Sequence, residues 1–448
     1  MVTDWRGAVV EVRLGPPGHG GFCVARHEGR VVFVRHGLPG ERVLAGVTED
    51  RGGSFCRADA IDILDPSPDR VPATCPVSGP GGAGCCDFSH AAPAAQRALK
   101  ASVVAEQLRR IAGIEREITV EPITGAGEET TGWRTRVRVP VDSRGRAGTH
   151  RYRSTEVIPD LRCPQPVPGA MDGIGDRLWT PGADLVVTVD GDGVRHIVEL
   201  APPVAETGSR RDRRQRRAAA GDRSGREPAA ADRSPGAQRR LAAARRAAAH
   251  GPREERISEG SGRAVEYVAG RRWELSATGF WQAHRNAAQC YSDQVAQWAA
   301  LPAGGTAWDL YSGVGVFAAR LGEQVGPSGS VQAVESARTP VADGAAALRD
   351  MPWVRLHAGR VEQWVTEHSG SAPDAVVLDP PRAGAGPAVV GAVTAAGPET
   401  IVHVGCDPAA FARDLGLYLA AGYRVADLRA FDAFPSTHHV ECLALLRR

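Results

Sequence analysis

Two glycines in the C-terminal third of the sequence stand where an apolar stretch gives way to a helical pattern. Residues 308–317 run through Gly313 and Gly315 into that pattern. Glycine lets a ligand approach the backbone closely, and the first turn of a helix presents amide donors without partners. Position 318 is Ala, so the third glycine of the dinucleotide motif is missing. The turn therefore predicts a site for a ligand that lacks a pyrophosphate.

An acid at the end of the next predicted strand narrows the choice of ligand. Glu335 follows the apolar run 331–334, and a carboxylate in this position can accept hydrogen bonds from both hydroxyls of a ribose. Together with the glycine turn it suits S-adenosylmethionine, a nucleoside without phosphates. The alternative is an ordinary strand, turn and helix followed by a surface Glu.

A rigid acidic loop follows another predicted strand. Residues 376–378 are apolar, and Asp379, Pro380, Pro381 and Arg382 come directly after them. The two prolines fix φ and remove backbone donors, so the loop is expected to be extended and stiff. Asp379 is then expected at the carboxyl end of a strand, facing the same crevice. The alternative is a plain Pro-Pro turn.

Two further residues could perform covalent and acid–base chemistry. Cys406 lies between the predicted strand 400–404 and a helix that starts well, with Asp407 as N-cap and Pro408 at its first position. The dipole of that helix is expected to favour a thiolate, which makes Cys406 a candidate nucleophile. Glu441 precedes the last apolar strand and is a candidate general base. A small buried thiol and a solvated Glu are the respective alternatives.

From residue 271 onward, predicted strands and helices alternate and are separated by Gly-containing turns. This alternation predicts a doubly wound α/β domain, Rossmann-like, with a mostly parallel sheet that binds ligands at the carboxyl ends of its strands. The predicted strands are 306–310, 330–334, 375–378, 400–404 and 424–431, and the predicted helices are 286–300, 316–323 and 408–420.

The N-terminal two thirds divide into two further parts. Short strands at 8–12, 30–34 and 41–45, separated by Gly/Pro turns, predict a small all-β barrel within residues 1–67. Residues 68–270 are expected to form a mixed α+β central domain, and 271–448 the α/β domain. The central domain is predicted to contain a cysteine-bearing loop at 75–86, a helix at 94–111 and strands at 135–141, 148–152 and 184–189.

The net charge of +2, from 54 Lys+Arg and 52 Asp+Glu, hides an uneven distribution. Between Ser209 and Arg256 there are 15 arginines and 6 acids, a surplus of nine that leaves the rest of the chain at −7. Lys100 is the only lysine. Segment 205–256 has almost no large apolar residues and is expected to be disordered or partly helical. It could tether RNA phosphates or be a passive solvated insertion.

Several classes of protein are excluded by composition. The first thirty residues lack the apolar run of a signal peptide, and about 18 consecutive apolar residues occur nowhere. Nine cysteines in 448 residues are too few for a disulfide scaffold. We therefore expect a cytoplasmic protein without membrane segments, which we expect to be monomeric.

Taken together, these motifs resemble the RNA uracil-C5 methyltransferase family over nearly the whole chain. Residues 5–65 resemble its TRAM barrel, an RNA-binding module, and 271–448 its methyltransferase domain; the stretch 280–282 resembles a further family motif. The resemblance implies rRNA or tRNA as partner and S-adenosylmethionine as cofactor. It assigns cofactor binding to Gln282, Tyr311, Glu335 and Asp379 with Gly313 and Gly315, substrate binding to Phe280 and Arg382, and catalysis to Cys406 and Glu441.

The implied chemistry explains the residue types. Uracil C5 is too weak a nucleophile to attack a methyl sulfonium unaided, so Cys406 would add to C6 and direct electrons to C5. Glu441 would then remove the C5 proton and allow Cys406 to leave. The base must be extruded or already unpaired, and Phe280 could stack on it. The rivals are an RNA-binding or assembly factor with an inactive domain, and a methyltransferase for a small molecule or DNA.

Three departures from the family pattern bear on ligands. Many relatives hold an iron–sulfur cluster on four cysteines, and here Cys75, Cys85, Cys86 and Cys163 would supply the ligands of a [4Fe-4S] cluster, with Ala83 where one ligand is expected. A degenerate loop packed without metal is the alternative. Arg360 replaces an acid or amide near the adenine, and Asp407 replaces an Asn. The adjacent His438 and His439 lack the spacing of a zinc site.

Overall fold

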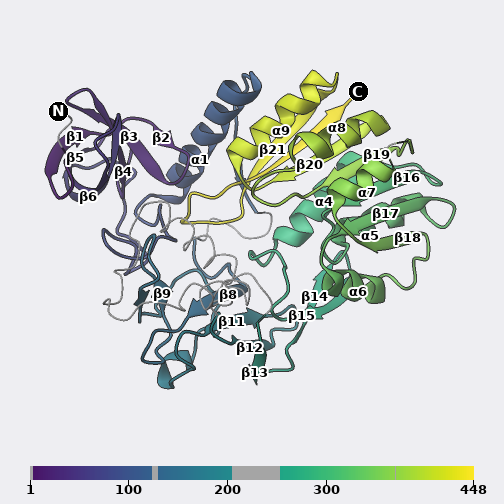
Figure 1. Cartoon of the computed structure of the whole chain (residues 1–448), viewed down its shortest axis with the longest axis horizontal. Coiled ribbons are helices and arrows are strands. Elements are labelled where there is room, and N and C mark those ends of the chain that lie inside the picture. Colours follow the sequence, from purple (N-terminus) through teal and green to yellow (C-terminus); the bar gives the residue numbers. More distant parts are fainter. Residues whose placement is uncertain (1–3, 124–129, 204–252, 369) are drawn as a thin grey trace, which may run out of the picture.

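The structure is a computed structural model, and it describes residues 4–123, 130–203, 253–368 and 370–448. The N-terminal barrel, the central part and the C-terminal α/β part follow one another around the molecule (Figure 1). In the described ranges no helix has the length and apolar character needed to cross a membrane.

The first part is a six-stranded sheet in the order β1-β5-β6-β4-β3-β2, which confirms the predicted small β domain. Alternate side chains of these strands, among them Val32, Val34 and Val43, are fully buried in a common core. Neighbouring strands are antiparallel except β4 and β6, which are parallel. The strands are β1 (Val9–Arg13), β2 (Pro17–Gly18), β3 (Phe22–His27), β4 (Arg30–Arg35), β5 (Arg42–Asp50) and β6 (Phe55–Asp65).

The central part contributes strands to four sheets. Its antiparallel sheet has the order β13-β12-β11-β8, formed by β8 (Arg136–Pro140), β11 (Asp184–Val189), β12 (Arg195–Leu200) and β13 (Glu255–Glu259). The strand β7 (Val120–Pro122) instead pairs in parallel with β21 (Arg424–Asp432) and forms one edge of the C-terminal sheet. Short pairs complete this part: β9 (Thr149–His150) with β10 (Val157–Ile158), and β14 (Arg263–Val268) with β15 (Arg271–Ser276). The predicted boundary at 270/271 falls in the turn of the second pair.

The end of the predicted disordered segment is ordered. Residues 253–256 lie in the described structure, and β13 pairs with β12. Arg253 donates hydrogen bonds to the carbonyls of Leu200 and Ala201. The prediction was wrong for these residues, because Arg side chains that suggest a solvated segment here satisfy carbonyls at a sheet edge. Residues 205–252 lie outside the described residues.

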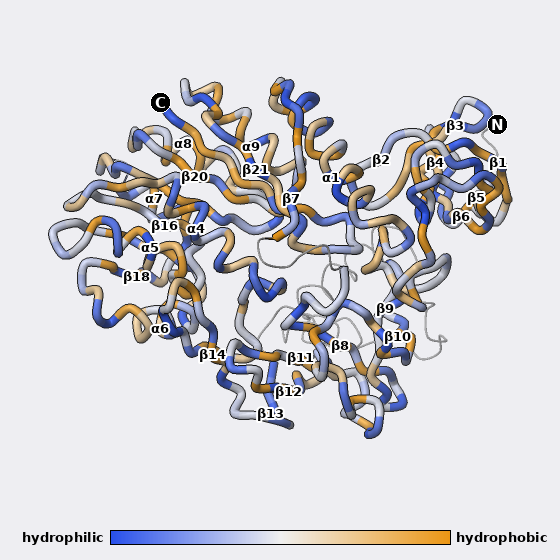
Figure 2. The backbone as a smooth tube through the Cα atoms, turned by 180° about the vertical axis from the view of Figure 1, so that it is seen from behind, coloured by the Kyte–Doolittle hydropathy of each residue, from blue (hydrophilic) through white to orange (hydrophobic). Residues whose placement is uncertain are grey.

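The C-terminal part confirms the doubly wound α/β prediction. Its sheet has the order β18-β17-β16-β19-β20-β22-β21-β7, with β22 antiparallel to both neighbours and the other pairs parallel. The strands are β16 (Thr306–Leu310), β17 (Ser330–Glu335), β18 (Val354–Ala358), β19 (Ala375–Leu378), β20 (Thr400–Gly405), β21 (Arg424–Asp432) and β22 (Glu441–Arg447). The orange tube along these strands shows how apolar they are (Figure 2).

Helices cover both faces of this sheet because its strands are apolar on both sides. Ala307 of β16 faces one core, while Trp308 and Leu310 face the other. The first core is closed by α4 (Ala287–Ala299), α5 (Val316–Val325) and α6 (Arg338–Ala347). The second is closed by α7 (Val361–Glu367), α8 (Gly386–Ala396), α9 (Pro408–Ala420) and α1 (Pro93–Gln107).

Helix α1 joins the three parts. It contacts β2 of the barrel on one side and β7 and α9 on the other, and it lies between the barrel and the C-terminal sheet (Figure 1). Pro93 begins the helix, and a π-helical turn (Leu108–Ala112) ends it. The single lysine, Lys100, lies on this helix and is 1% exposed. Its position places a buried cation next to the loop that follows β21.

Candidate active site

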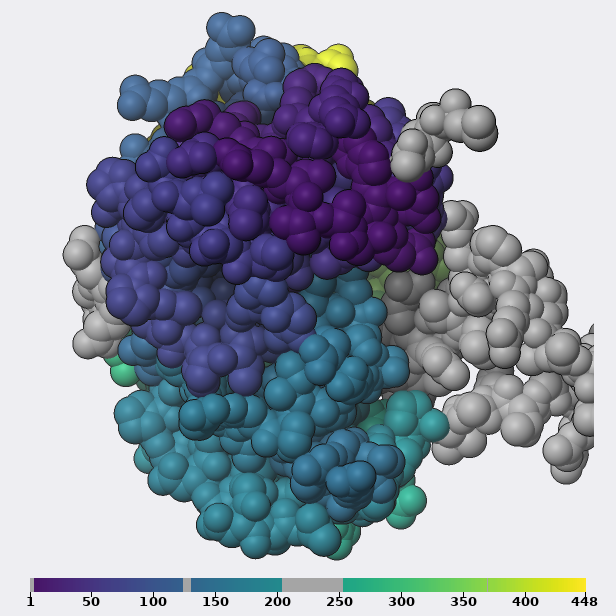
Figure 3. Space-filling model, turned by 90° about the vertical axis from the view of Figure 1, so that its left-hand side faces the viewer, coloured from purple at the N-terminus to yellow at the C-terminus, as the bar shows by residue number. Residues whose placement is uncertain are grey.

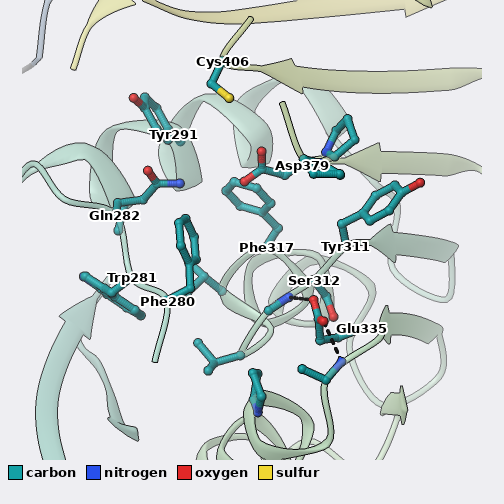
Figure 4. A pocket seen from close by; sticks show the side chains of 18 of the residues that line it. Phe280, Trp281, Gln282, Tyr291, Tyr311, Ser312, Phe317, Glu335, Asp379 and Cys406 are labelled. Atoms are coloured by element: carbon teal, nitrogen blue, oxygen red, sulfur yellow. Dashed lines mark hydrogen bonds between the residues drawn. The ribbon is translucent and has the colours of Figure 1, made fainter. Parts of the chain in front are cut away.

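One cavity of about 960 Å³ collects almost every residue that the sequence singles out. It opens at the carboxyl ends of β16, β17, β19 and β20, as expected for a doubly wound sheet. Figure 4 shows aromatic, acidic and thiol side chains turned toward this space. The predicted residues that line it are Phe280, Gln282, Tyr311, Gly313, Glu335, Asp379, Arg382, Cys406 and Glu441. Gly315 is not among the lining residues.

The turn after β16 depends on left-handed backbone conformations. Tyr311, Gly313 and Gly315 have φ of 64°, 54° and 77°, and only glycine adopts such values at low cost. A Cβ on Gly315 would lie 3.2 Å from Leu348, so this glycine permits close packing of the turn. Gly315 therefore packs against Leu348 on the side of the turn away from the cavity lining, whereas Gly313 borders the cavity itself.

The carboxylate of Glu335 is held in place at the end of β17. Its Oε2 accepts a hydrogen bond from the Gly313 amide (3.3 Å), and its Oε1 accepts from the Ala337 amide (2.8 Å) and the Ser336 hydroxyl (2.9 Å) (Figure 4). The acid thus bridges the glycine turn and the start of α6. This fixed carboxylate can accept further hydrogen bonds from a ligand in the cavity.

The segment before α4 supplies an aromatic wall. Phe280 is 71% exposed, an unusual state for a large apolar side chain, and lines the cavity beside Trp281 and Gln282 (Figure 4). The neighbouring Trp273 and Trp281 rings pack with centroids 6.2 Å apart. An exposed aromatic ring at a cavity mouth suits stacking on a flat ligand.

Three carboxyl groups crowd the inner end of the cavity. Asp379 lines the cavity and is partly buried, and desolvation raises its pKa to about 7. Burial also raises the pKa of Glu441 well above its usual value, with Asp379 adding to the effect and Arg382 opposing it. Behind them, burial together with Asp379 and Glu335 raises the pKa of Asp309 to about 7. The empty cavity therefore disfavours negative charge.

The thiol of Cys406 does not have the thiolate character that its place before a helix predicts. Burial, together with Glu441 and Asp379, raises its pKa to about 12, although Arg382 and a backbone hydrogen bond act in the opposite direction. The amides of Ala409 and Ala410 donate to Asp407 Oδ1 at 3.1 and 2.9 Å. Burial and the neighbouring carboxyl groups thus outweigh the stabilisation that the helix dipole was expected to give the thiolate.

The residues that depart from the expected pattern also lie at this site. Arg360 lines the cavity, and its guanidinium lies 3.6 Å from Glu362, another lining residue. The acid expected at position 360 is thus absent, but Glu362 places a carboxylate in the cavity lining two positions later. His439 lines the cavity and contacts Arg382, whose Nη2 lies 3.1 Å from the imidazole Nε2. His439 of the adjacent histidine pair therefore helps to fix the position of the Arg382 guanidinium.

Other lining residues escape sequence reasoning. Tyr291 of α4 is fully buried and its hydroxyl has no partner in the structure, yet on the helix it looks like any core aromatic. Phe317 and Phe434 also border the cavity; each lies within a stretch that the sequence singles out, but neither was assigned a role. Asp309 has a usable signal, because an acid in the middle of the apolar strand β16 is unusual. Its Oδ2 accepts from the Ala318 amide at 2.8 Å.

The four cysteines of the expected cluster come together beneath the barrel. Cys86 lies within hydrogen-bonding reach of the thiols of Cys75, Cys85 and Cys163. These contacts lower the pKa of Cys75 to about 7 and also lower that of Cys163. In donor chemistry the set fits a thiolate-ligated group. Across the described ranges, however, no three His, Cys, Asp or Glu side chains surround a point in a way that could hold a single metal ion.

Comparisons with known proteins agree with this architecture. Residues 353–448 match the family described as tRNA (Uracil-5-)-methyltransferase, and residues 5–60 match the TRAM domain. An uncharacterized RNA methyltransferase of Streptomyces avermitilis is 42% identical, with 98% of each chain covered. The 23S rRNA (uracil(1939)-C(5))-methyltransferase RlmD of Alkalilimnicola ehrlichii is 31% identical over 98% of this chain and 96% of its own.

A solved structure shares the fold over the full length. The tRNA (uracil-54, C5)-methyltransferase of Pyrococcus abyssi, in complex with S-adenosyl-L-homocysteine, aligns with a TM-score of 0.67. The alignment covers 98% of this chain and 100% of that one at 19% identity. It supports the arrangement of barrel, central part and α/β part.

Replacing Asp309 with Asn should flatten the pH dependence of stability. Folding raises the pKa of Asp309 from 3.8 to about 7, so its ionisation costs the folded state more than the unfolded state. The wild type therefore loses stability from this residue as pH rises from about 4 to 7. Relative to wild type, the free energy of unfolding of the variant should rise by about 2–4 kcal/mol between pH 4 and pH 8. Urea unfolding followed by Trp fluorescence measures this. The same difference in free energy of unfolding between variant and wild type at both pH values would contradict the prediction.

Proposed function

Because the chain belongs to the RNA uracil-C5 methyltransferase family, and is thus an S-adenosylmethionine-dependent RNA methyltransferase, we propose that it methylates C5 of a uridine through a covalent bond between Cys406 and C6. The observation that carries this proposal is the shared cavity. A thiol, a carboxyl group and an exposed aromatic ring line the same space as the fixed Glu335.

The cofactor end of the cavity is assigned to the glycine turn and its neighbours. Glu335 would accept hydrogen bonds from the ribose hydroxyls, and Tyr311, Gln282 and Asp379 would complete the contacts. These residues surround the turn at Gly313, which is open enough for close approach. When bound, S-adenosylmethionine supplies an electrophilic methyl group on a cationic sulfur. That positive charge suits a cavity bordered by Glu335, Asp379 and Glu441.

The chemistry begins with the thiol of Cys406. The thiol gives its proton to the carboxylate of Asp379, which faces it, and Arg382 stabilises the resulting thiolate. The sulfur then forms a bond to C6, the C5–C6 π electrons take the methyl group, and C5 carries both methyl and hydrogen. The Glu441 carboxylate removes the C5 proton, the double bond reforms and the C6–S bond breaks. The products are 5-methyluridine, S-adenosylhomocysteine and the Cys406 thiolate, which takes back its proton from Asp379, while Glu441 keeps the C5 proton until it passes to solvent.

We further propose ribosomal RNA as the substrate class. The support is the full-length relative named as a 23S rRNA enzyme, at 31% identity. Transfer RNA is the alternative, since the matching family is described as a tRNA enzyme. An inactive assembly factor is disfavoured because Cys406 and Glu441 both border the cavity. Phe280, exposed at its mouth, would stack on the extruded base.

Substitution of the two catalytic residues should give different outcomes. Cys406→Ala should abolish methyl transfer to RNA from a strain lacking the gene, because no nucleophile reaches C6. Glu441→Gln should still form the bond to C6 but eliminate slowly, so a covalent protein–RNA complex should accumulate on denaturing gels. The measurement is tritium transfer from S-adenosylmethionine to separated rRNA and tRNA, with Cys290→Ser as control. Full turnover by Cys406→Ala would contradict the mechanism.

We also propose that Cys75, Cys85, Cys86 and Cys163 hold an iron–sulfur cluster. Convergence of three thiols on Cys86 and the lowered pKa of Cys75 and Cys163 support the proposal. Beside them, Gln165 donates a hydrogen bond to the Cys86 sulfur at 3.3 Å. The cluster would be a thiolate-ligated structural group, and no step of methyl transfer needs it.

Protein purified without oxygen should therefore be brown and contain about four iron atoms per chain. Cys86→Ser should lose the colour and most of the iron, because this residue lies at the centre of the four thiols. Cys290→Ser, which changes a cysteine outside the group, should keep both. Iron analysis and visible absorbance provide the measurement. A colourless, iron-free wild type would show that the loop packs without metal.

A further inference from the structure

The loop between β21 and β22, residues 433–440, carries two lining residues into the cavity and leads directly into Glu441. Its beginning is held by α1. Lys100 Nζ donates to Asp432 Oδ1 at 2.5 Å and to the Phe434 carbonyl at 3.0 Å. Gln96 Oε1 accepts from the Ser436 amide at 2.7 Å. The base-bearing loop is thus fixed by residues from the N-terminal part of the chain.

The end of this loop is held by one buried carboxylate, Asp87. Its Oδ2 accepts a hydrogen bond from His438 Nδ1 at 2.6 Å, and its Oδ1 accepts from Arg35 Nη2 at 2.9 Å. Asp87 is 3% exposed. Arg35 is the last residue of β4, and its guanidinium lies over the Tyr152 ring at 3.5 Å. One acid therefore joins the barrel, the segment just after the cysteine-bearing loop and the catalytic loop. Figure 3 shows the barrel, in purple, lying against the segment that follows it in the sequence.

From His438 a line of contacts reaches the cavity. The rings of His438 and His439 have centroids 4.1 Å apart, and His439 Nε2 lies 3.1 Å from Arg382 Nη2. Burial lowers the pKa of His439 to about 3, so the ring is neutral and keeps a nitrogen that can accept from the arginine. Arg382 is the cation that faces Cys406 and Glu441.

A second contact from the barrel reaches the same side of the site. His19 Nε2 lies 3.1 Å from Oδ2 of Asp407, the residue after the nucleophile. The barrel therefore contacts the helix start beside Cys406 directly through His19, and it reaches the loop before Glu441 through Arg35 and Asp87. A site assembled in this way is sensitive to how the barrel is seated.

We propose that Asp87 is a positioning residue, which through His438 and His439 fixes Arg382 opposite Cys406 and Glu441 and makes a complete active site depend on the seated barrel. The inference rests on the proposed function in so far as Cys406 is the nucleophile. Asp87 acts through other residues and is not itself expected to touch RNA or cofactor. A shift of about 1 Å in a catalytic group is enough to reduce a rate on the order of 100-fold.

The test compares His438→Ala with His438→Gln. The alanine variant removes the donor to Asp87, while Gln keeps an N–H at a similar distance. His438→Ala should lower kcat for RNA methylation on the order of 10- to 100-fold, with affinity for S-adenosylhomocysteine within about twofold, because the glycine turn and Glu335 are untouched. His438→Gln should recover most of kcat. Arg35→Gln should also lower kcat, although Arg35 belongs to the barrel.

A readout without RNA separates this inference from the proposed function. Iodoacetamide labelling of Cys406 at pH 8, followed by mass spectrometry of its peptide, should be slower in His438→Ala by up to about tenfold, the effect of one pKa unit on the thiolate fraction. The groups that face this thiol are Glu441, Asp379 and Arg382. Absence of RNA methylation by the wild type would refute the function while leaving this comparison intact.

Asp50→Asn is the matched control for loss of a buried ion pair. Asp50 accepts hydrogen bonds from Arg30 within the barrel at 2.6 and 3.0 Å and makes no contact with the catalytic loop. The control should lower stability and leave kcat and the labelling rate unchanged. The proposal is overturned if His438→Ala keeps wild-type kcat and labelling, or if Asp50→Asn reduces them equally.

Discussion

The balance of charge around Cys406 is the constraint on which the rest of the structure depends. Three carboxyl groups lie at one end of a parallel sheet, where burial penalises their charged forms. The same burial holds the thiol in its protonated form. Arg382 is the cation that opposes both effects, so its placement decides how readily the thiol and the base can ionise.

This constraint gives the non-catalytic parts a role. The sheet alone brings Asp379, Cys406 and Glu441 to the cavity, because each lies at or beside a strand end. It does not by itself place Arg382, whose guanidinium contacts His439 on the loop after β21. That loop is held by α1 and by Asp87. The barrel, known by its match as a TRAM domain, thus contributes to the geometry of the site as well as offering a surface.

Sequence reasoning predicted best what depends on neighbouring residues. The strands β16 and β19 and the helix α9 have the predicted bounds, because Gly or Pro follows each strand within a few residues and Asp407 marks the helix start. It missed β7, three residues whose strand character depends on pairing with β21 about 300 positions away. The helix that follows Cys406 predicted a thiolate, but burial and the carboxyl groups of Glu441 and Asp379, which the sequence pattern does not show, raise the pKa of the thiol. No sequence pattern pointed to Asp87, because its hydrogen-bond partners, Arg35 and His438, lie 52 and 351 positions away in the chain. The cytoplasmic, monomeric state stays a prediction.

The covalent bond between Cys406 and uracil C6 is the claim that most needs a direct measurement. RNA transcribed with 5-fluorouridine tests it, because fluorine at C5 cannot be removed as a proton and elimination cannot follow methylation. With S-adenosylmethionine present, we predict a stable protein–RNA complex that contains the transferred methyl group, with the nucleotide attached to the peptide carrying Cys406. Methylation of natural RNA without any such adduct on Cys406 would contradict the account.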